Sequence, residues 1–127
     1  MSRISVDATE VGQLAADLTA AAPRVQGEAL RAVDRAAVQV KKTARDRVKG
    51  LAHAPAYPSS IGYDTRWDGA VYEAEIGPDK DKRQGALGNL LEYGSVNNPP
   101  VPHLGPALDA ELPQLAAALA RAAGRPW

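Results

Sequence analysis

The chain has 127 residues, a length typical of one domain, and we expect a single domain over residues 1–127. Fifteen basic side chains balance fifteen acidic ones, and this zero net charge argues against a protein that coats nucleic acid by bulk charge. Cysteine is absent, which excludes disulfide frameworks, thiolate zinc sites and cysteine nucleophiles. Apolar residues make up 45%, but 25 of them are alanine, so we expect a thin core that favours closely packed helices.

No segment of the sequence reads as a membrane or export signal. No apolar run approaches the roughly 20 residues that cross a bilayer. The first residues, Met1–Val6, lack the apolar stretch of a signal peptide. We therefore expect a soluble protein made in a cytoplasm, with no membrane partner.

The N-terminal segment is predicted to hold a strand and then a helix. Residues 3–7 alternate polar and apolar side chains, as a short strand does. Over residues 8–22, apolar residues recur at the spacing of a helix, which predicts a helix ended or kinked by Pro23. The residues at this spacing are Val11, Leu14, Ala15 and Leu18.

A long helix is predicted over residues 24–50. At 100° per residue, seven apolar residues fall within about 80° of arc, the stripe of a helix that packs on a core. Gly50 is a natural stop, and Arg47 and Lys49 place positive charge in the last turn, where the helix dipole favours it. The stripe consists of Leu30, Val33, Ala37, Val40, Ala44, Val48 and Leu51.

A β-hairpin is predicted over residues 61–76. Two alternating segments flank Asp68-Gly69, a dipeptide favoured in two-residue type I′ turns. Such a turn sets a register that puts six side chains on one face: Thr65 opposite Tyr72, Tyr63 opposite Ala74, and Ile61 opposite Ile76. On the other face, Asp64 would lie opposite Glu73, with Arg66 close by.

The C-terminal half is predicted to be helical in two places. Residues 86–93 can form a short helix, and a longer segment starts with Pro106 in its first turn. Pro113 lies inside its apolar stripe, which predicts a kink or two short helices. The whole pattern predicts an α+β fold: a small antiparallel sheet built on the hairpin, packed by the long helix of the N-terminal half and by a C-terminal helix.

Catalytic and metal chemistry find little support in the sequence. His53 beside Ser59-Ser60 can be imagined as a base and a nucleophile, but a turn rich in small polar residues explains them better. Asp79 and Asp81 are spaced like the start of a calcium loop, but its later acids and glycine are missing. We expect no enzyme, no catalytic residue, no metal, no cofactor and no small-molecule substrate.

The long helix also carries a basic face, centred about 140° from the apolar stripe by the same arithmetic. An ordinary solvated helix face explains it, and so does a face directed at nucleic acid or at an acidic partner. The face, which we call the basic face throughout, consists of Arg24, Arg31, Arg35, Lys42, Arg45 and Lys49.

The hairpin carries an acidic side formed by Asp64, Glu73 and Glu75. These acids can pair with the basic face of a neighbouring subunit. They can equally belong to a solvated strand edge, where charge discourages uncontrolled edge pairing. Both interpretations stay open from the sequence alone.

Three features in order resemble a phage family. Leu90-Leu91-Glu92-Tyr93-Gly94-Ser95 is similar to an aromatic-Val-Glu-Phe-Gly-Thr motif. Pro102-His103-Leu104-Gly105-Pro106-Ala107-Leu108-Asp109 is similar to a Pro-Phe-Leu-Arg-Pro-Ala-Leu-Asp motif. A long Ala/Arg/Lys helix and a hairpin ending in Ile76-Gly77-Pro78 precede them. This order resembles the tail-component family of long-tailed phages typified by the tenth gene product of phage HK-ninety-seven, over roughly residues 14–123.

The matched residues have a physical account as well. Gly94 lets the chain turn after the short helix, and Glu92 can cap or pair locally or contact a neighbouring subunit. The remaining motif residues, Tyr93, Pro102, Leu104, Pro106 and Leu108, either serve folding or form interfaces. Pro102 and Pro106 would stiffen the start of the last helix, and Leu108 would pack inward.

The resemblance implies a structural virion protein of the neck or tail end, a head–tail joining, tail-completion or minor tail protein. It would form a homo-oligomeric ring, with six subunits the expected number, and contact other neck and tail proteins. Hairpin edges and the loops 78–86 and 94–102 would make subunit contacts, and the basic face would line a DNA passage. Alternatives are a tail terminator or head–tail stopper, a small nucleic-acid-binding protein that uses helix 24–50, and a hydrolase with His53 and Ser60.

Overall fold

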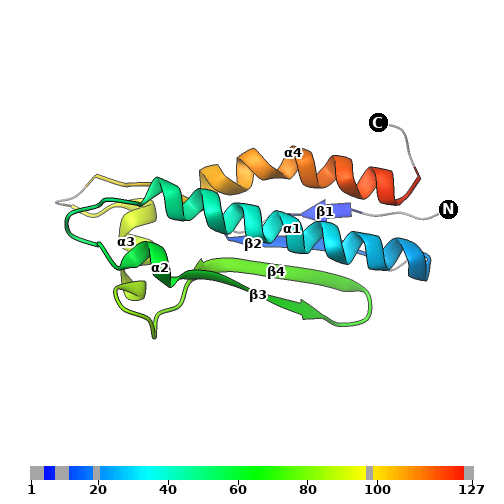
Figure 1. Ribbon diagram of the computed structural model, residues 1–127, viewed down its shortest axis with the longest axis horizontal. Helices are drawn as coiled ribbons and strands as arrows, with labels where there is room; N and C mark the ends of the chain where they lie inside the picture. The colour runs from blue at the N-terminus through cyan, green and yellow to red at the C-terminus, as the bar shows by residue number, and fades with distance from the viewer. Residues whose placement is uncertain (1–4, 8–11, 19–20, 97–98, 125–127) are drawn as a thin grey trace.

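The computed structural model describes residues 5–7, 12–18, 21–96 and 99–124. Its sheet is antiparallel, with the strand order β1-β2-β4-β3. The strands are β1 (Ser5–Asp7), β2 (Gln13–Asp17), β3 (Ile61–Trp67) and β4 (Val71–Pro78). Helix α1 (Pro23–Arg47) packs on β2, β3 and β4, and α4 (Leu104–Ala122) runs alongside α1 (Figure 1). This arrangement confirms the predicted α+β fold.

Smaller elements gather at one end of the molecule (Figure 1). They are the short helices α2 (Tyr57–Ser60) and α3 (Gly88–Tyr93), with a single 3₁₀ turn, η1 (Gly85–Leu87), leading into α3. The predicted helix over residues 86–93 is thus confirmed as a 3₁₀ turn followed by α3. Among the described helices, none combines the length and apolarity that a bilayer crossing needs.

The long helix α1 confirms its predicted stripe. Pro23 occupies its first turn, where a missing N–H costs nothing, and Gly50 adopts a positive φ just beyond its end. Its buried side chains are small, so neighbouring elements can approach closely. They are Val25, Ala29, Ala32, Val33, Ala36, Ala37, Val40 and Ala44.

The helix predicted over residues 8–22 is wrong where the structure describes this segment. Residues 13–17 form β2, and the buried side chains are Leu14, Ala16 and Leu18, which recur every second residue. Gly12 precedes the strand at φ +91°, and a Cβ there would collide with the carbonyl oxygen of Ile76. Leu14 and Leu18 fit the spacing of a helix as well as that of a strand. The segment forms a strand because it pairs with β4. Val11 lies outside the described residues.

The hairpin is present, but its predicted register is shifted by two residues. Trp67 pairs with Tyr72, so the connection is longer than a two-residue type I′ turn. The Asp68 carboxylate accepts hydrogen bonds from the N–H groups of Ala70 and Val71, each 2.8 Å long. These bonds also lower the pKa of Asp68. A carboxylate-capped loop therefore replaces the tighter turn.

A shift of two residues leaves every side chain on its predicted face but changes its partner. Thr65 lies opposite Ala74, and Asp64 lies opposite Glu75 instead of Glu73. Glu73 instead faces Arg66, and the two form an exposed ion pair of 2.6 Å. The expected like-charge contact thus falls on Asp64 and Glu75.

The prediction for the C-terminal segment is a kink or two short helices. The segment forms one helix of 19 residues, so the second of these alternatives is wrong. Pro113 lies inside it on the exposed side. Leu108, Leu115 and Leu119 are buried with the apolar stripe of α1 in one core. Packing along α1 outweighs the single backbone hydrogen bond that the proline removes.

Candidate functional site

Glu92 organises a buried cluster at the N-terminus of α4. Its carboxylate comes from α3 and accepts three backbone hydrogen bonds: from His103 at 3.1 Å, from Leu104 at 2.8 Å and from Gly105 at 3.2 Å. These N–H groups begin a helix and have no partner within it, and a negative charge also suits that end of the helix dipole. Glu92 is only 7% exposed. The local capping role expected as one alternative is therefore the one observed in the chain.

His103 and Tyr57 extend this cluster into the core. The Nδ1 atom of His103 lies 3.1 Å from the Glu92 carboxylate and 3.0 Å from the carbonyl oxygen of Val101. Both neighbours accept hydrogen bonds, so Nδ1 carries a proton. The Nε2 atom lies 2.7 Å from the Tyr57 hydroxyl, which donates to it when the ring is neutral. Burial raises the pKa of Tyr57, and the nearby Glu92 charge raises it further.

The two motif segments therefore meet in space, because the Glu92 carboxylate of the first accepts from the backbone of the second. Gly94 turns the chain at φ +78°, as expected. Leu104 and Leu108 are buried, and the carbonyl oxygen of Pro102 accepts a hydrogen bond of 3.1 Å from Arg47. Pro106 lies in the first turn of α4. Cluster and motif thus form one structural unit.

An apolar patch is exposed on this same unit. Trp67, Leu90, Tyr93 and Val96 are the large hydrophobic side chains that the described residues expose. Three of them fall between residues 90 and 96, and Tyr93 is 64% exposed. We call Leu90, Tyr93 and Val96 the apolar patch. Clustered exposed apolar side chains mark an interaction surface more often than scattered ones do.

The structure divides the basic face. Arg31 and Arg35 remain exposed and line a hollow of about 240 Å³ between α1 and α4, together with Arg121 of α4. Arg121 is not among the residues predicted from the sequence, because the helix spacing of α4 does not reveal which helix lies beside it. Glu28 also lines the hollow and forms an exposed ion pair of 3.2 Å with Arg24. Three arginines therefore surround a space with one acid at its rim.

The other members of the basic face are not equivalent. Arg45 donates two hydrogen bonds, of 3.0 and 2.6 Å, to the carbonyl oxygen of Ile61, so it serves the fold. Lys42 and Lys49 are exposed. Five members of the predicted face therefore remain exposed, and Arg45 alone is drawn into the fold.

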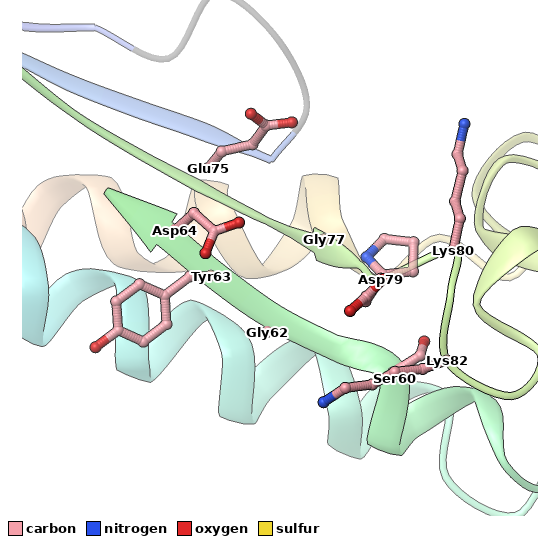
Figure 2. A pocket seen from close by; sticks show the side chains of 10 residues that line it. Ser60, Gly62, Tyr63, Asp64, Glu75, Gly77, Asp79, Lys80 and Lys82 are labelled. Carbon is pink, nitrogen blue, oxygen red and sulfur yellow. The ribbon is translucent and has the colours of Figure 1, made fainter. Parts of the chain in front are cut away.

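The acidic side lies on the sheet face that α1 leaves open. Figure 2 shows Asp64 and Glu75 projecting from neighbouring strands on that face, while Tyr63 points away from it. Both acids line an open hollow, which also contains Asp79, Lys80 and Lys82. Within the described residues, no group of three or more His, Cys, Asp or Glu side chains is placed to hold a metal. The hollow carries mixed charge.

Ser60 and His53, the imagined nucleophile and base, lie in different surroundings, one buried and the other exposed. Ser60 is 1% exposed, and its hydroxyl donates a hydrogen bond of 2.6 Å to the carbonyl oxygen of Tyr57. His53 is exposed, and its carbonyl oxygen accepts from Gln84. The Ser60 proton is therefore committed to the turn that starts β3.

Comparison with known proteins adds no assignment, because no family model, no curated protein and no solved structure matches the chain.

Proposed function

We propose that this protein is a structural subunit of the neck or tail end of a long-tailed phage, with a head–tail joining or tail-completion role. It acts by binding, and it assembles as a ring, with six subunits expected, in the virion. The apolar patch carries the proposal, because Leu90 and Tyr93 lie in the first motif segment, Val96 directly follows it, and all three side chains are exposed. Tail terminator and head–tail stopper are alternative positions in the same machine.

Hydrogen bonds hold the segment that carries the apolar patch, and this supports a docking role. Glu92, between Leu90 and Tyr93 in the same short helix, is tied to three N–H groups of α4. The backbone of Leu91 is also tied down, because its carbonyl oxygen accepts from Val101 at 2.6 Å. A surface held by the fold loses little conformational freedom when a partner binds, and this favours affinity.

The charges suit an assembling subunit as well. Basic side chains lie on the outer side of α1, and Asp64 and Glu75 lie on the open face of the sheet. Opposite charges on separate surfaces of one chain can meet between neighbours in a head-to-tail ring. In that arrangement, Arg31, Arg35 and Arg121 would face either a neighbour or the DNA passage.

A stop codon early in this gene tests the role directly. We expect electron microscopy of lysates to show DNA-filled heads separated from tails, or tails of abnormal length. A plasmid copy of the gene should restore joined virions. Normal infectious particles from the mutant would contradict the proposal.

The patch itself is tested with Tyr93→Glu. Because Tyr93 is 64% exposed, the variant should fold normally, yet it should fail to restore joined virions from the plasmid. Asn89→Glu is the matched control, since Asn89 is an exposed residue of the same helix. Full complementation by Tyr93→Glu, with thermal unfolding unchanged, would remove the patch from the proposal.

A second candidate function, nucleic-acid binding, is favoured by the three-arginine hollow. Phosphate contacts there would give salt-dependent binding with little sequence preference, with a slope of roughly −3 in log K against log salt for three contacts. The variant Arg31→Glu/Arg35→Glu/Arg121→Glu should lose this binding to duplex DNA in fluorescence anisotropy. A matched triple exchange in the exposed loop, Lys80→Glu/Lys82→Glu/Arg83→Glu, should retain it. Equal loss of DNA binding in both variants would indicate that binding depends on net charge and not on the hollow.

A further inference from the structure

The outer edge of β3 is the starting point, because β3 is the last strand in the order β1-β2-β4-β3. In an antiparallel pair, every second residue directs its N–H and C=O toward the partner strand. Two bonds flank the β3–β4 pair: Asp79 to Ser60 at 2.9 Å and Asp68 to Val71 at 3.4 Å. The even-numbered residues of β3 therefore direct their backbone groups toward β4.

The odd-numbered residues of β3 consequently direct their N–H and C=O away from the sheet. Ile61 agrees with this assignment, because its carbonyl oxygen accepts from Arg45, which reaches it from α1. Beyond Ile61, the outward groups belong to Tyr63, Thr65 and Trp67. They present a short row of backbone donors and acceptors to an additional strand.

We propose that a second copy of this chain pairs along this edge, antiparallel, with a two-fold axis through Thr65. In that register Thr65 lies opposite the partner's Thr65, and Tyr63 lies opposite the partner's Trp67. Asp64 then lies opposite the partner's Arg66, twice by symmetry. The two sheets join into one through hydrogen bonds of the outward backbone groups.

Charge favours this register over the two adjacent registers of the strand pair. Only residues with outward backbone groups can pair by hydrogen bonds, so the strands slide in steps that change each pairing by two residues. One step in one direction places Asp64 opposite the partner's Asp64. One step in the other places Arg66 opposite the partner's Arg66. Like charges directly opposite each other are unfavourable, whereas the proposed register contains only opposite charges there.

The pairing also offsets an unfavourable contact between like charges within the single chain. Asp64 lies opposite Glu75 on β4, and Figure 2 shows both on the same side of the sheet. The partner's Arg66 would lie on the other flank of Asp64. Cross-strand pairs that do not exchange hydrogen bonds bring their side chains closest, which suits an ion pair at this position.

The helix side of the sheet is complementary too. The Tyr72 hydroxyl donates a 2.7 Å hydrogen bond to Asp34, and Tyr72 pairs with Trp67. At the other end of β3, the Lys41 ammonium lies 5.7 Å from the centre of the Tyr63 ring. Because Trp67 lies opposite the partner's Tyr63, Asp34 comes to the same end as the partner's Lys41. The helix side of the joined sheet thus carries opposite charges at the same end, in addition to the Asp64–Arg66 pairs on the other side.

A two-fold pairing closes on itself and gives a dimer. It covers part of Trp67, which is 40% exposed in the single chain. The apolar patch and the three-arginine hollow lie outside this edge, so the inference does not rest on the proposed function. Asp64 lies on the edge itself, so a chain paired here uses Asp64 for this contact and not for a basic side chain in a head-to-tail ring.

Charge exchange tests the register. Light scattering during gel filtration should give twice the 13.3 kDa chain mass for the natural protein at high micromolar concentration. Asp64→Arg and Arg66→Asp, tested separately, should each weaken the dimer by about tenfold or more, because each creates two like-charge pairs. The double variant Asp64→Arg/Arg66→Asp should restore it. A monomeric natural protein, or two single variants that dimerise normally, would overturn the proposal.

Mixing the two single variants sharpens the test. An Asp64→Arg chain against an Arg66→Asp chain has opposite charges at both sites, so the mixture should form dimers that neither variant forms alone. Circular dichroism should show both variants folded before mixing. Failure of the mixture to form dimers, with both chains folded, would overturn the register.

A single cysteine gives an independent measurement, because the natural chain has none. Thr65→Cys places two cysteines opposite each other at the two-fold axis, about 5.5 Å apart between Cα atoms, within the range of a disulfide. Mild oxidation should cross-link most of this variant. Glu75→Cys is the matched control, exposed on the central strand β4, and should remain uncross-linked. Equal cross-linking of both variants would contradict the pairing.

Discussion

Helix α4 is held in two places by different physics. Along its length it packs against α1, where the side chains of α1 are small, as with Ala32 and Ala36, and the contact holds few polar atoms in its interior. At its N-terminus it is held by Glu92 and His103, through hydrogen bonds between buried groups.

The two places should respond differently to substitution. Dispersion and apolar burial have no direction, so packing loses free energy gradually as volumes change. A buried carboxylate with three donors loses several hydrogen bonds at once and leaves those donors unsatisfied. We therefore expect the N-terminal cluster to be the less tolerant region, and the two motif segments meet there.

Glu92→Ala should have the largest effect. It removes the acceptor for the N–H groups of His103, Leu104 and Gly105, so we expect a loss of about 2–4 kcal/mol in the free energy of unfolding. Urea unfolding measures it. Glu75→Ala, an exposed acid, should change stability by no more than about 0.5 kcal/mol. Similar values for both variants would abolish the contrast between the two regions.

Ala36→Leu tests the packed region. Ala36 is 2% exposed on α1 and borders a hollow between α1 and α4. A larger side chain must therefore crowd α4 on one side of that hollow, at about 1–3 kcal/mol. Ala86→Leu is the control, since Ala86 is exposed in η1 and lies outside the contact between α1 and α4. Thermal unfolding of the two variants should separate them. No difference between them would show that the helix pair is loosely packed.

Tyr57→Phe should cost about 1 kcal/mol at neutral pH, because it removes the hydrogen bond to His103. Its stronger signature is the pH dependence of stability. Since burial raises the pKa of Tyr57, its contribution is complete below the ordinary tyrosine pKa, near 10. It is lost as the pH rises from there toward the folded-state pKa.

The natural protein should therefore lose stability above about pH 10 more steeply than Tyr57→Phe. Urea midpoints between pH 8 and pH 11 measure the slopes. Tyr93→Phe, which alters an exposed ring, should follow the natural protein. Parallel slopes for natural protein and Tyr57→Phe would mean that Tyr57 ionises as readily in the folded chain.

Glu111→Gln should have the smallest effect. Partial burial beside α1 raises the pKa of Glu111, so the folded state favours its neutral form. The variant should be slightly more stable at pH 7, within about 0.5 kcal/mol, since solvent screens this site. The difference should vanish below the unfolded-state pKa, near 4.3, where both states are protonated. A variant less stable at pH 7 would contradict the sign.

Periodicity predicted correctly those elements whose apolar residues fit the spacing of only one kind of secondary structure. The apolar residues of α1 fit only a helix, and the alternation across residues 61–76 fits only a hairpin. Leu14 and Leu18 satisfy both periods, and β4, more than fifty residues away, decided for a strand. The hairpin register depended on Asp68, whose carboxylate stabilises a longer connection than its dipeptide suggests.

Sequence periodicity was sufficient to predict the α+β class, the position of α1 and five exposed basic residues along it. The tertiary structure alone decided that Glu92 receives three N–H groups of α4, that His103 is buried against Tyr57, and that Arg121 joins Arg31 and Arg35. The physical reason is that a period reports which side of an element is apolar. Hydrogen bonds and charge pairs instead depend on which atoms lie within about 3 Å, and only the packing of distant segments sets that.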